Sequence, residues 1–373
     1  MGLFHLPSIV TNDLIFCYDM NNTQKSWKGK PTENLYGNAI DYDLGLANGY
    51  WTLNDNDTNS IKLSSTFASW CVYWSAALAA NTVYTFSCEY KSDVEGSTLY
   101  WDNDGVDDNT WNVALSATTE WQKYTFTRTN ITAGNMKMYI KRNSGGNIYV
   151  KKVQIEQNSF ATPFVKGTRS NTQAILDLTN NNTITATSLT YNSDGTFNFD
   201  GSNNYITITD NNILTSTTAL SIDIWFKSSD IQTRINELIG KGSSDTDEEY
   251  VISIYKDWIY FDVGNALGPY IQPTTSLINN TWYNIVGVHN RNAGSSTLII
   301  YLNGIALSAN VNLPTNIPNN NSLPVSIGRR FYNSDPYTRT FNGIISLVKI
   351  YNRALSAAEV SQNFAAHRGR YGI

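Results

Sequence analysis

The chain has 373 residues, of which 41% are hydrophobic, 13% aromatic and 15% charged. This length exceeds one compact core of ordinary size, so we expect two domains. The formal net charge of −5 arises from 26 basic and 31 acidic residues, and no basic run of the kind that neutralises phosphates is present. Nucleic acid is therefore excluded as an expected partner.

The first residues, MGLFHLPSIVTND, lack a basic region and a long apolar run. We therefore expect neither a signal peptide nor membrane insertion, and a protein that is made in the cytoplasm. Three cysteines, Cys17, Cys71 and Cys88, show no CxxC spacing, and their odd number argues against a disulfide framework. We interpret them as small buried hydrophobic residues.

Short segments with period-two alternation recur along the chain between turn-rich stretches, which is typical of all-β sandwiches. In the first half, strands are predicted at residues 83–90, 121–127, 136–141 and 148–155. In the second half, residues 220–226 alternate so that one face carries Leu220, Ile222, Ile224 and Phe226. Because Asn-Gly favours a type I′ turn, Asn303-Gly304 predicts a hairpin between residues 297–302 and 305–307.

One short helix is predicted near the end of the chain. Ser356 and Glu359 form an S-x-x-E capping box, and Leu355 and Val360 occupy the positions of a hydrophobic staple. Gly369 predicts the end of the helix. We expect this helix to cover an edge or end of a sandwich.

From Phe199 onward the sequence resembles the laminin-G-like, concanavalin A-like sandwich family. The segments that carry this resemblance are residues 199–206, 220–227, 281–286, 298–304 and 341–356. Residues 9–19 resemble the opening strand of the same family in tailed-phage structural proteins, where the next segment reads like residues 175–179. The resemblance implies that another domain has been inserted between these two pieces, in a loop that tolerates insertion.

The inserted segment resembles the jelly-roll carbohydrate-binding modules. Its exit, residues 153–164, and its beginning, residues 29–35, are similar to sequences of phage tail and virion proteins. We therefore predict an all-β chain of two β-sandwiches. Residues 1–30 plus 169–373 form a discontinuous laminin-G-like domain, and residues 31–168 form a jelly roll inserted into it.

Catalysis is not indicated by any motif. Glycoside hydrolysis needs two carboxyl groups beside the bond, and the E-x-D-x-x-E strand pattern is absent. The acidic run 245–249 is interpreted as a solvated loop. His5, His289 and His367 form no triad or metal signature and are interpreted as surface or packing residues. We predict that the protein is not an enzyme, and keep a glycan-degrading enzyme as the third alternative.

No cofactor is predicted, although two segments were considered for calcium. Residues 102–108 carry alternating oxygen ligands, but lack the bidentate Glu of an EF-hand. The family resemblance also implies a calcium motif, in which Ser346 stands where an acidic residue is expected. The metal site is therefore left unknown.

Glycan binding requires aromatic rings for the apolar faces of sugars, together with polar groups for their hydroxyls. The inserted domain is rich in aromatic residues within polar, turn-rich segments. The predicted glycan-binding residues are Trp70, Tyr73, Trp74, Trp101 and Trp111. By contrast, Trp225 and Trp282 occupy family packing positions and are assigned to the scaffold.

These observations predict a non-catalytic structural protein of the virion surface, either a head decoration, a fibre or a tail component, with an adhesive glycan-binding role. The expected partners are other virion proteins and cell-surface or environmental glycans, and the chain could form a homo-oligomer. The main alternative is a pure assembly protein without glycan binding, whose aromatic patches would be buried at interfaces.

Overall fold

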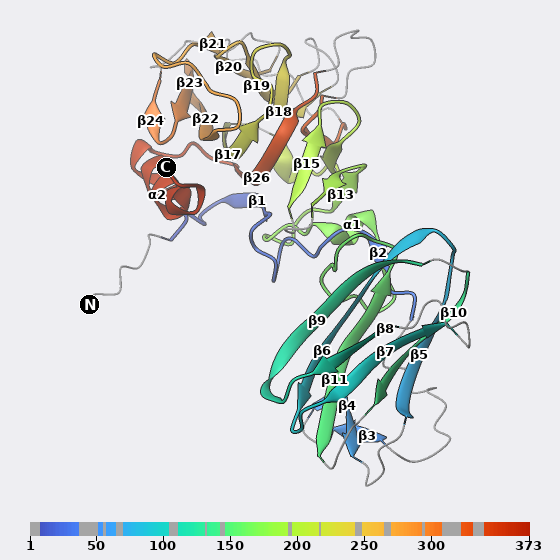
Figure 1. The fold of residues 1–373 in the computed structure, drawn as a ribbon. Coiled ribbons are helices and arrows are strands. Elements are labelled where there is room, and N and C mark those ends of the chain that lie inside the picture. The colour runs from blue at the N-terminus through green and yellow to red at the C-terminus, as the bar shows by residue number, and fades with distance from the viewer. Residues whose placement is uncertain are drawn as a thin grey trace. The chain divides into compact units, whose positions relative to one another are not determined.

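The computed structural model describes residues 8–36, 51–54, 57–64, 70–103, 111–130, 133–141, 146–192, 196–215, 218–242, 248–264, 270–292, 295–307, 322–330 and 339–373. The chain splits into two compact units (Figure 1). Unit 1 comprises Met1–Gly29 and Asn171–Ile373, and unit 2 comprises Lys30–Ser170. Both units are built from β-sheets, so the predicted all-β class is confirmed.

Unit 1 has two sheets within the described residues. Sheet A has the order β14 (Thr190–Tyr191), β15 (Phe197–Asp200), β26 (Asn342–Tyr351), β17 (Ala219–Ser228), β22 (Trp282–Asn292), β23 (Ser295–Leu302) and β24 (Ile305–Ala306), and β1 (Leu14–Asp19) also pairs with β26. Sheet B has the order β13 (Ile184–Thr187), β16 (Tyr205–Ile208), β25 (Val325–Ile327), β18 (Asn236–Lys241), β19 (Tyr250–Tyr255), β20 (Trp258–Val263) and β21 (Tyr270–Ile271). The helical elements are α1 (Asn171–Ala174), the 3-10 turn η2 (Asn212–Leu214) and α2 (Ala357–Tyr371).

The main core of unit 1 contains apolar residues from both sheets. The four apolar residues expected on one face of β17, from Leu220 to Phe226, are all buried in this core, which confirms the predicted alternation. Packing is tight at Gly287 on β22, where a Cβ atom would come within 2.8 Å of the Phe261 ring. A side chain at Gly287 would therefore push the neighbouring aromatic ring out of position.

The predicted hairpin at Asn303-Gly304 is confirmed. It joins β23 to β24, with Tyr301 paired to Ala306 and Leu302 to Ile305. Both turn residues have positive φ, 48° at Asn303 and 77° at Gly304. This is the conformation that a type I′ turn requires, and it explains why the turn has this sequence.

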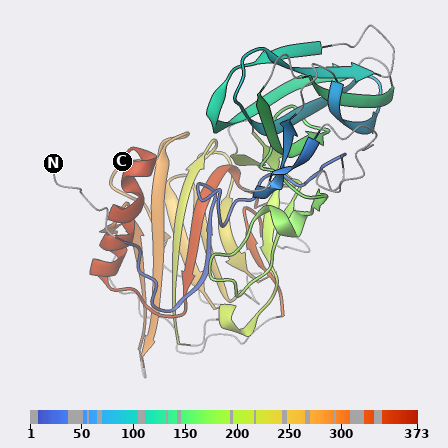
Figure 2. The same ribbon diagram turned by 90° about the horizontal axis from the view of Figure 1, so that it is seen from below.

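Helix α2 begins with the predicted capping box, since Ser356 and Glu359 each cap the backbone N–H of the other. The expected end at Gly369 is wrong, because the helix continues to Tyr371 and is capped by Gly372 at φ 73°. Tyr371 stacks on the buried Trp225 at a ring distance of 4.3 Å, which favours the longer helix. The helix therefore packs on the outer face of sheet A, not at an edge or end of the sandwich (Figure 2).

A buried ion pair lies on the same face of sheet A. Lys349 Nζ is 2.6 Å from Asp223 Oδ2, and the two side chains are 0% and 1% exposed. Asn284 Nδ2 donates to the other carboxylate oxygen at 2.7 Å. This pairing matters because a buried charge without a partner is strongly destabilising.

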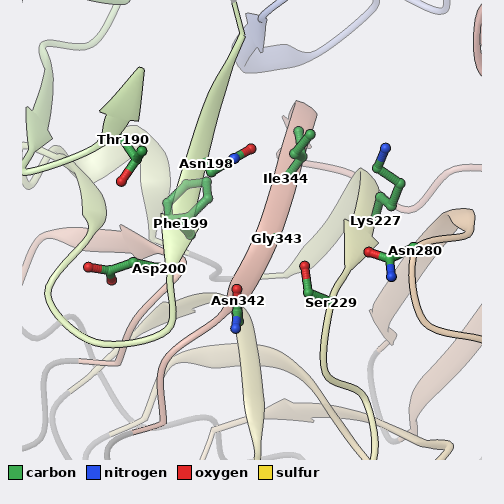
Figure 3. Close-up of a pocket in the computed structure, with 10 residues that line it drawn as sticks. All are labelled: Thr190, Asn198, Phe199, Asp200, Lys227, Ser229, Asn280, Asn342, Gly343 and Ile344. Atoms are coloured by element: carbon green, nitrogen blue, oxygen red, sulfur yellow. The ribbon is translucent and has the colours of Figure 1, made fainter. Parts of the chain in front are cut away.

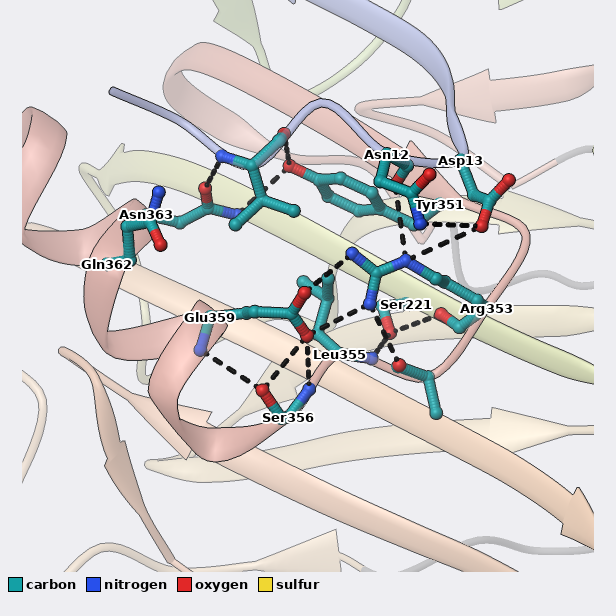
Figure 4. A network of polar contacts seen from close by, with 12 residues as sticks. Asn12, Asp13, Ser221, Tyr351, Arg353, Leu355, Ser356, Glu359, Gln362 and Asn363 are labelled. Carbon is teal, nitrogen blue, oxygen red and sulfur yellow. Dashed lines mark hydrogen bonds and ion pairs between the residues drawn. The ribbon is translucent and has the colours of Figure 1, made fainter. Parts of the chain in front are cut away.

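The first described residues are held by the end of the chain (Figure 4). Val10 donates its N–H to Asn363 Oδ1 of α2 at 2.9 Å and accepts from the Tyr351 hydroxyl at 2.9 Å. Arg353 Nε donates to the Asn12 carbonyl, while its other nitrogens contact Glu359 at 2.8 and 2.9 Å. Leu14 to Asp19 pair with β26, so the segment that resembles the opening strand of the laminin-G-like family is a strand of sheet A.

Asp177 joins the two sequence segments of unit 1. Its Oδ1 accepts from the N–H of Cys17 on β1 at 2.9 Å, and its Oδ2 accepts from Thr179 and Asn182. The side chain is 4% exposed. Segments that are 160 residues apart in sequence are therefore tied by one carboxylate.

Unit 2 is the second sandwich. Sheet C has the order β3 (Trp51–Asn54), β4 (Asp57–Ser64), β11 (Asn147–Glu156), β6 (Thr82–Ser92) and β9 (Thr118–Asn130), and sheet D has the order β5 (Trp70–Leu78), β10 (Gly134–Lys141), β7 (Ser97–Asn103) and β8 (Trp111–Leu115). Its core includes Phe86 and Ile155 from sheet C and Leu99 from sheet D. Where the chain enters and leaves unit 2, β2 (Thr32–Glu33) pairs with β12 (Thr168–Arg169), so the two ends of the unit lie side by side.

Candidate functional site

The five predicted glycan-binding residues all lie on sheet D. Trp70, Tyr73 and Trp74 are on β5, Trp101 is on β7 and Trp111 is on β8. Strand pairing places three tryptophans in one row, because Trp74 and Trp101 both pair with Met138, and Trp101 also pairs with Trp111. This row therefore joins tryptophans that are up to 37 positions apart in sequence, 74 to 111.

The adjacent row of sheet D contains Tyr73, Tyr139 and Tyr100. The side chains of the five predicted residues lie outside the described part of the structure, and their role in glycan binding stays a prediction.

A cleft of about 370 Å³ lies on the outer face of sheet A in unit 1 (Figure 3). It is formed where β15, β26 and β17 run side by side, and Asn280 from the segment before β22 completes it. The residues that line it are Thr190, Asn198, Phe199, Asp200, Lys227, Ser229, Asn280, Asn342, Gly343 and Ile344. Core residues such as Phe226 and Ile345 alternate with these lining positions, so the cleft lies on the face opposite the core.

The polar side chains of this cleft are mostly uncommitted. Within the described residues, the side chains of Ser229, Asn280 and Asn342 have no hydrogen-bond partner. Asn198 is half-buried, and its Oδ1 is shielded from solvent with no hydrogen-bond partner in the described part of the chain. Amide and hydroxyl groups can both donate and accept, so the cleft offers hydrogen bonds of both kinds to a polar ligand.

Asp200 supplies the one carboxylate among the lining residues. Its Oδ1 accepts from the backbone N–H groups of Ser202, Asn203 and Asn204, at 2.8, 3.1 and 3.3 Å. Partial desolvation alone would raise the pKa of this carboxyl, but these hydrogen bonds outweigh it and the pKa is lowered. Asp200 therefore stays ionised at neutral pH and is an acceptor, not an acid.

Sheet B carries an exposed aromatic cluster. The ring of Tyr270 lies 5.4 Å from Trp258 and 5.8 Å from Tyr260, and Tyr270 is 59% exposed. Trp258 and Tyr260 alternate with the buried Ile259 and Phe261 on β20, so they face away from the core. Such rings can stack on the apolar face of a sugar.

The acidic residues near β19 do not form the solvated loop that was expected. Glu248 and Glu249 are 5% and 1% exposed, so that interpretation is wrong for them, and residues 245–247 lie outside the described part. Glu248 is paired with Arg330 at 2.8 Å, and Glu249 with the fully buried Lys241 at 2.9 Å. Charge pairing replaces the lost hydration and allows both carboxylates to be buried.

Glu237 on β18 is a buried acid that has no sequence signature. It is 0% exposed, and neither carboxyl oxygen has a hydrogen-bond partner among the residues that the structure describes. Burial raises its pKa well above the ordinary value, against the lowering effect of Arg330. Its complete burial keeps Glu237 from the lining of the cleft.

The histidines and cysteines that the structure describes act in packing. His289 is buried with Nε2 2.9 Å from the Ser296 hydroxyl, and burial lowers its pKa to about 4. His367 packs edge-on against Trp225, and its pKa is also lowered to about 4 by burial and then by Lys349. Cys17 and Cys88 are buried and unpaired, as expected, while His5 and the side chain of Cys71 lie outside the described residues.

Metal binding finds no support within the described chain, where no three His, Cys, Asp or Glu side chains are grouped so as to hold an ion. Of the calcium candidate at residues 102–108, residues 104–108 lie outside the described part of the structure. Ser346 is 2% exposed and accepts from the Tyr371 hydroxyl at 3.0 Å. Neither described helix is both long and apolar enough to cross a membrane.

The sequence analysis named no residue of the cleft as a ligand contact. A usable signal existed in the polar positions that alternate with Phe197 and Phe199 on β15, and in the Asn342-Gly343 pair on β26. These positions belong to family strands, but their meeting at one cleft depends on strand order. Strand order is not visible in a local sequence pattern.

The sequence of residues 200–361 matches the laminin G-type family described as the concanavalin A-like lectin/glucanases superfamily. Unit 1 has a concanavalin A-like fold. The match covers most of the strands of this sandwich, including those that carry the aromatic cluster, and seven of the ten residues that line the cleft. The superfamily includes both lectins and glucanases, so the fold by itself does not choose between binding and hydrolysis.

Comparison with solved structures finds the binding domain of botulinum neurotoxin serotype D, at 16% identity and a TM-score of 0.41, covering 52% of this chain and 50% of that one. Botulinum neurotoxin type C, whose cell entry depends on interaction with two ganglioside molecules, gives 14% identity and a TM-score of 0.40, and the match covers 52% of this chain and 49% of that one. The binding domain of botulinum neurotoxin DC in complex with rat synaptotagmin II gives 15% identity and a TM-score of 0.40, and the match covers 52% of this chain and 49% of that one.

The chain thus spans about half the length of these solved structures. Similarity of this degree does not indicate a common ligand. Among curated proteins, the chain has no match.

Proposed function

We propose that the protein is a non-catalytic glycan-binding protein and that the cleft of unit 1 is a binding site. The observation that carries this proposal is the set of uncommitted polar side chains around one cleft, Asn198, Ser229, Asn280 and Asn342. A sugar presents many hydroxyl groups, each of which can donate and accept a hydrogen bond, and an amide side chain can also do both. The volume of about 370 Å³ is in the range of small-ligand sites.

A binding role is favoured over glycoside hydrolysis by the carboxyl groups. Hydrolysis needs an acid and a second carboxylate on opposite sides of the bond, about 5–9.5 Å apart. The cleft lining contains Asp200 alone, and its lowered pKa makes it a poor proton donor at neutral pH. Glu237 has the opposite character but is fully buried.

The test is a glycan array with the full chain and single substitutions in the cleft. Asn342→Ala removes an uncommitted amide without removing a described hydrogen bond of that side chain. We expect tenfold or greater weakening of binding, as for an anchor residue of a polar site. Trp74→Ala in unit 2 is the comparison: a loss there, with Asn342→Ala unchanged, would move the site to the predicted tryptophan row. Release of sugar from the array would instead support the enzyme.

The exposed Trp258, Tyr260 and Tyr270 cluster is a second surface on which sugars could stack. Tyr270→Ala separates its contribution from that of the cleft. Because Tyr270 is largely exposed, this substitution should leave stability nearly unchanged. A glycan that binds across both surfaces would lose affinity in either variant.

The setting that we propose for this binding is the surface of a tailed-phage particle. The support is the resemblance of residues 9–19, 29–35 and 153–164 to phage structural sequences. Mass spectrometry of purified particles and immunogold labelling of intact particles test this proposal. Absence of the chain from particles would refute it. A chain that is present but inaccessible to antibody and binds no glycan would be an assembly protein.

A further inference from the structure

Lys227 is the cation of the cleft, and it has no acidic partner. It is half-buried on β17 between Ile344 of β26 and Trp282 of β22, to both of which it is paired in the sheet. Within the described residues its ammonium group makes no ion pair, and its recorded contact is with the Trp282 ring, 5.2 Å from the centroid. The charge is therefore free to meet a ligand.

Other cations on the same face of unit 1 are neutralised by the protein. Lys349 is paired with Asp223 at 2.6 Å, and Arg370 contacts both carboxylate oxygens of Asp19 at 2.8 Å. Lys227 is the member of this group that borders the cleft, and it is the one that lacks such a pair. An unneutralised cation at a polar cleft favours a negatively charged ligand.

Trp282 fixes the position of Lys227. Its ring is half-buried and lies 4.6 Å from the ring of Tyr371, which is itself stacked on Trp225. With Tyr371 and Lys227 beside it, Trp282 orients the ammonium group and is not the stacking surface for a sugar. A cation whose position is set in advance loses less conformational freedom when it binds.

Asp200 stands on the other side of β26 from Lys227 (Figure 3). Between these two charges lie Asn342 and Gly343, and Ser229 and Asn280 lie beside Lys227. The cleft thus has a positive side, a neutral amide-lined middle and a negative side. Carboxylates accept hydrogen bonds from hydroxyls, so the negative side suits the neutral, hydroxyl-bearing part of a ligand.

We propose that the cleft selects acidic glycans: the carboxylate of a hexuronic or sialic acid residue pairs with Lys227, and the sugar hydroxyls bond to the amides and to Asp200. This proposal rests on the proposed function, because it names the class of glycan for the same cleft. The contact is a single, partly exposed ion pair, so binding should weaken as ionic strength rises.

The experiment uses the full chain and matched pairs of oligosaccharides, namely oligogalacturonate, oligoglucuronate and sialyllactose, each with its carboxyl-reduced form. Calorimetry should show at least one acidic member bound about tenfold or more tightly than its reduced form. Lys227→Gln should lower affinity for the acidic form by the same factor and leave the reduced form unchanged. Lys227→Arg should restore preference for the acid.

Lys256→Gln is the matched control, because Lys256 is an exposed lysine beside a tyrosine ring at 5.1 Å and does not line the cleft. It changes the net charge equally, so weakening in this variant as well would indicate a long-range charge effect and overturn the proposal. Equal binding of acidic and reduced forms would overturn the acid preference while leaving glycan binding intact. Binding of neither form in any pair, with no neutral glycan bound on the array, would refute the proposed function itself.

Discussion

Replacing Lys349 by methionine should destabilise unit 1 strongly. The ammonium group lies 2.6 Å from Asp223 Oδ2, and both side chains are essentially inaccessible to water. Methionine fills similar space but leaves the Asp223 carboxylate with Asn284 as its one remaining side-chain partner among the described residues. Removing one member of a buried pair typically costs about 3–5 kcal/mol, since the other charge is then buried and uncompensated.

The second substitution, Asp223→Leu in the Lys349→Met background, separates pairing from packing. Replacing both charges by apolar groups is often close to neutral, so the double variant should recover most of the lost stability. A loss of about 3 kcal/mol lowers the folding equilibrium constant roughly 100-fold, which urea unfolding measures easily. Lys227→Met is the control, because Lys227 has no acidic partner among the described residues and should change stability by about 0.5 kcal/mol or less.

His367 gives an independent readout of the same change. Burial and, as the next contribution, the Lys349 charge lower its pKa to about 4. Removing that charge should raise the pKa of His367, which an NMR titration of the imidazole detects. A Lys349→Met variant within about 1 kcal/mol of the wild type, or a double variant no more stable than the single one, would show that this pair contributes little.

Three other perturbations test separate parts of the fold. The Arg353 hydrogen bond and then the Ser356 N–H lower the pKa of Glu359 to about 2. The contribution of ionised Glu359 to folding stability is therefore complete above its unfolded pKa of about 4.5 and is lost as the pH falls toward 2. Thermal melts of wild type and Glu359→Gln should therefore converge as the pH falls through that window, and a constant gap would contradict the assignment. Gly304→Ala places a side chain at a position with positive φ, where its Cβ would lie 3.0 Å from the Phe364 ring. Urea unfolding should show that this substitution lowers the free energy of unfolding by about 1–3 kcal/mol, and no change would refute the strain argument. Deleting residues 33–166 and closing the gap with a short Gly-Ser linker should leave unit 1 folded, because β2 and β12 already bring these ends together; loss of cooperative unfolding by circular dichroism would show that the units depend on each other.

Local patterns predicted the elements that local forces determine. The alternation of β17, the Asn303-Gly304 turn and the Ser356 capping box each depend on residues close in sequence, and each was confirmed. The end of α2 was misplaced because Tyr371 gains its burial from Trp225, a residue 146 positions earlier, 225 to 371. The tertiary contact between Tyr371 and Trp225 outweighs the local tendency of Gly369 to end the helix.

The candidate site was beyond local prediction for the same reason. Asn198, Lys227 and Asn342 come from three strands that become neighbours through the order of sheet A. Glu248 was interpreted as solvated because its partner, Arg330, lies far along the chain. The partner of Glu249, Lys241, is close in sequence, but it meets Glu249 through the pairing of β18 with β19. A run of acidic residues alone therefore does not distinguish a solvated loop from a buried, charge-paired segment.

The bonds between residues 8–13 and the C-terminal region have a mechanical consequence. Val10 is tied to Asn363 and Tyr351, and β1 runs antiparallel to β26, so the chain forms a loop that is fastened at its two ends. A pulling force applied at both termini would first act on these hydrogen bonds and on the pairing of β1 with β26. Unit 2, which lies in sequence between Gly29 and Asn171, would carry no tension until this pairing was broken.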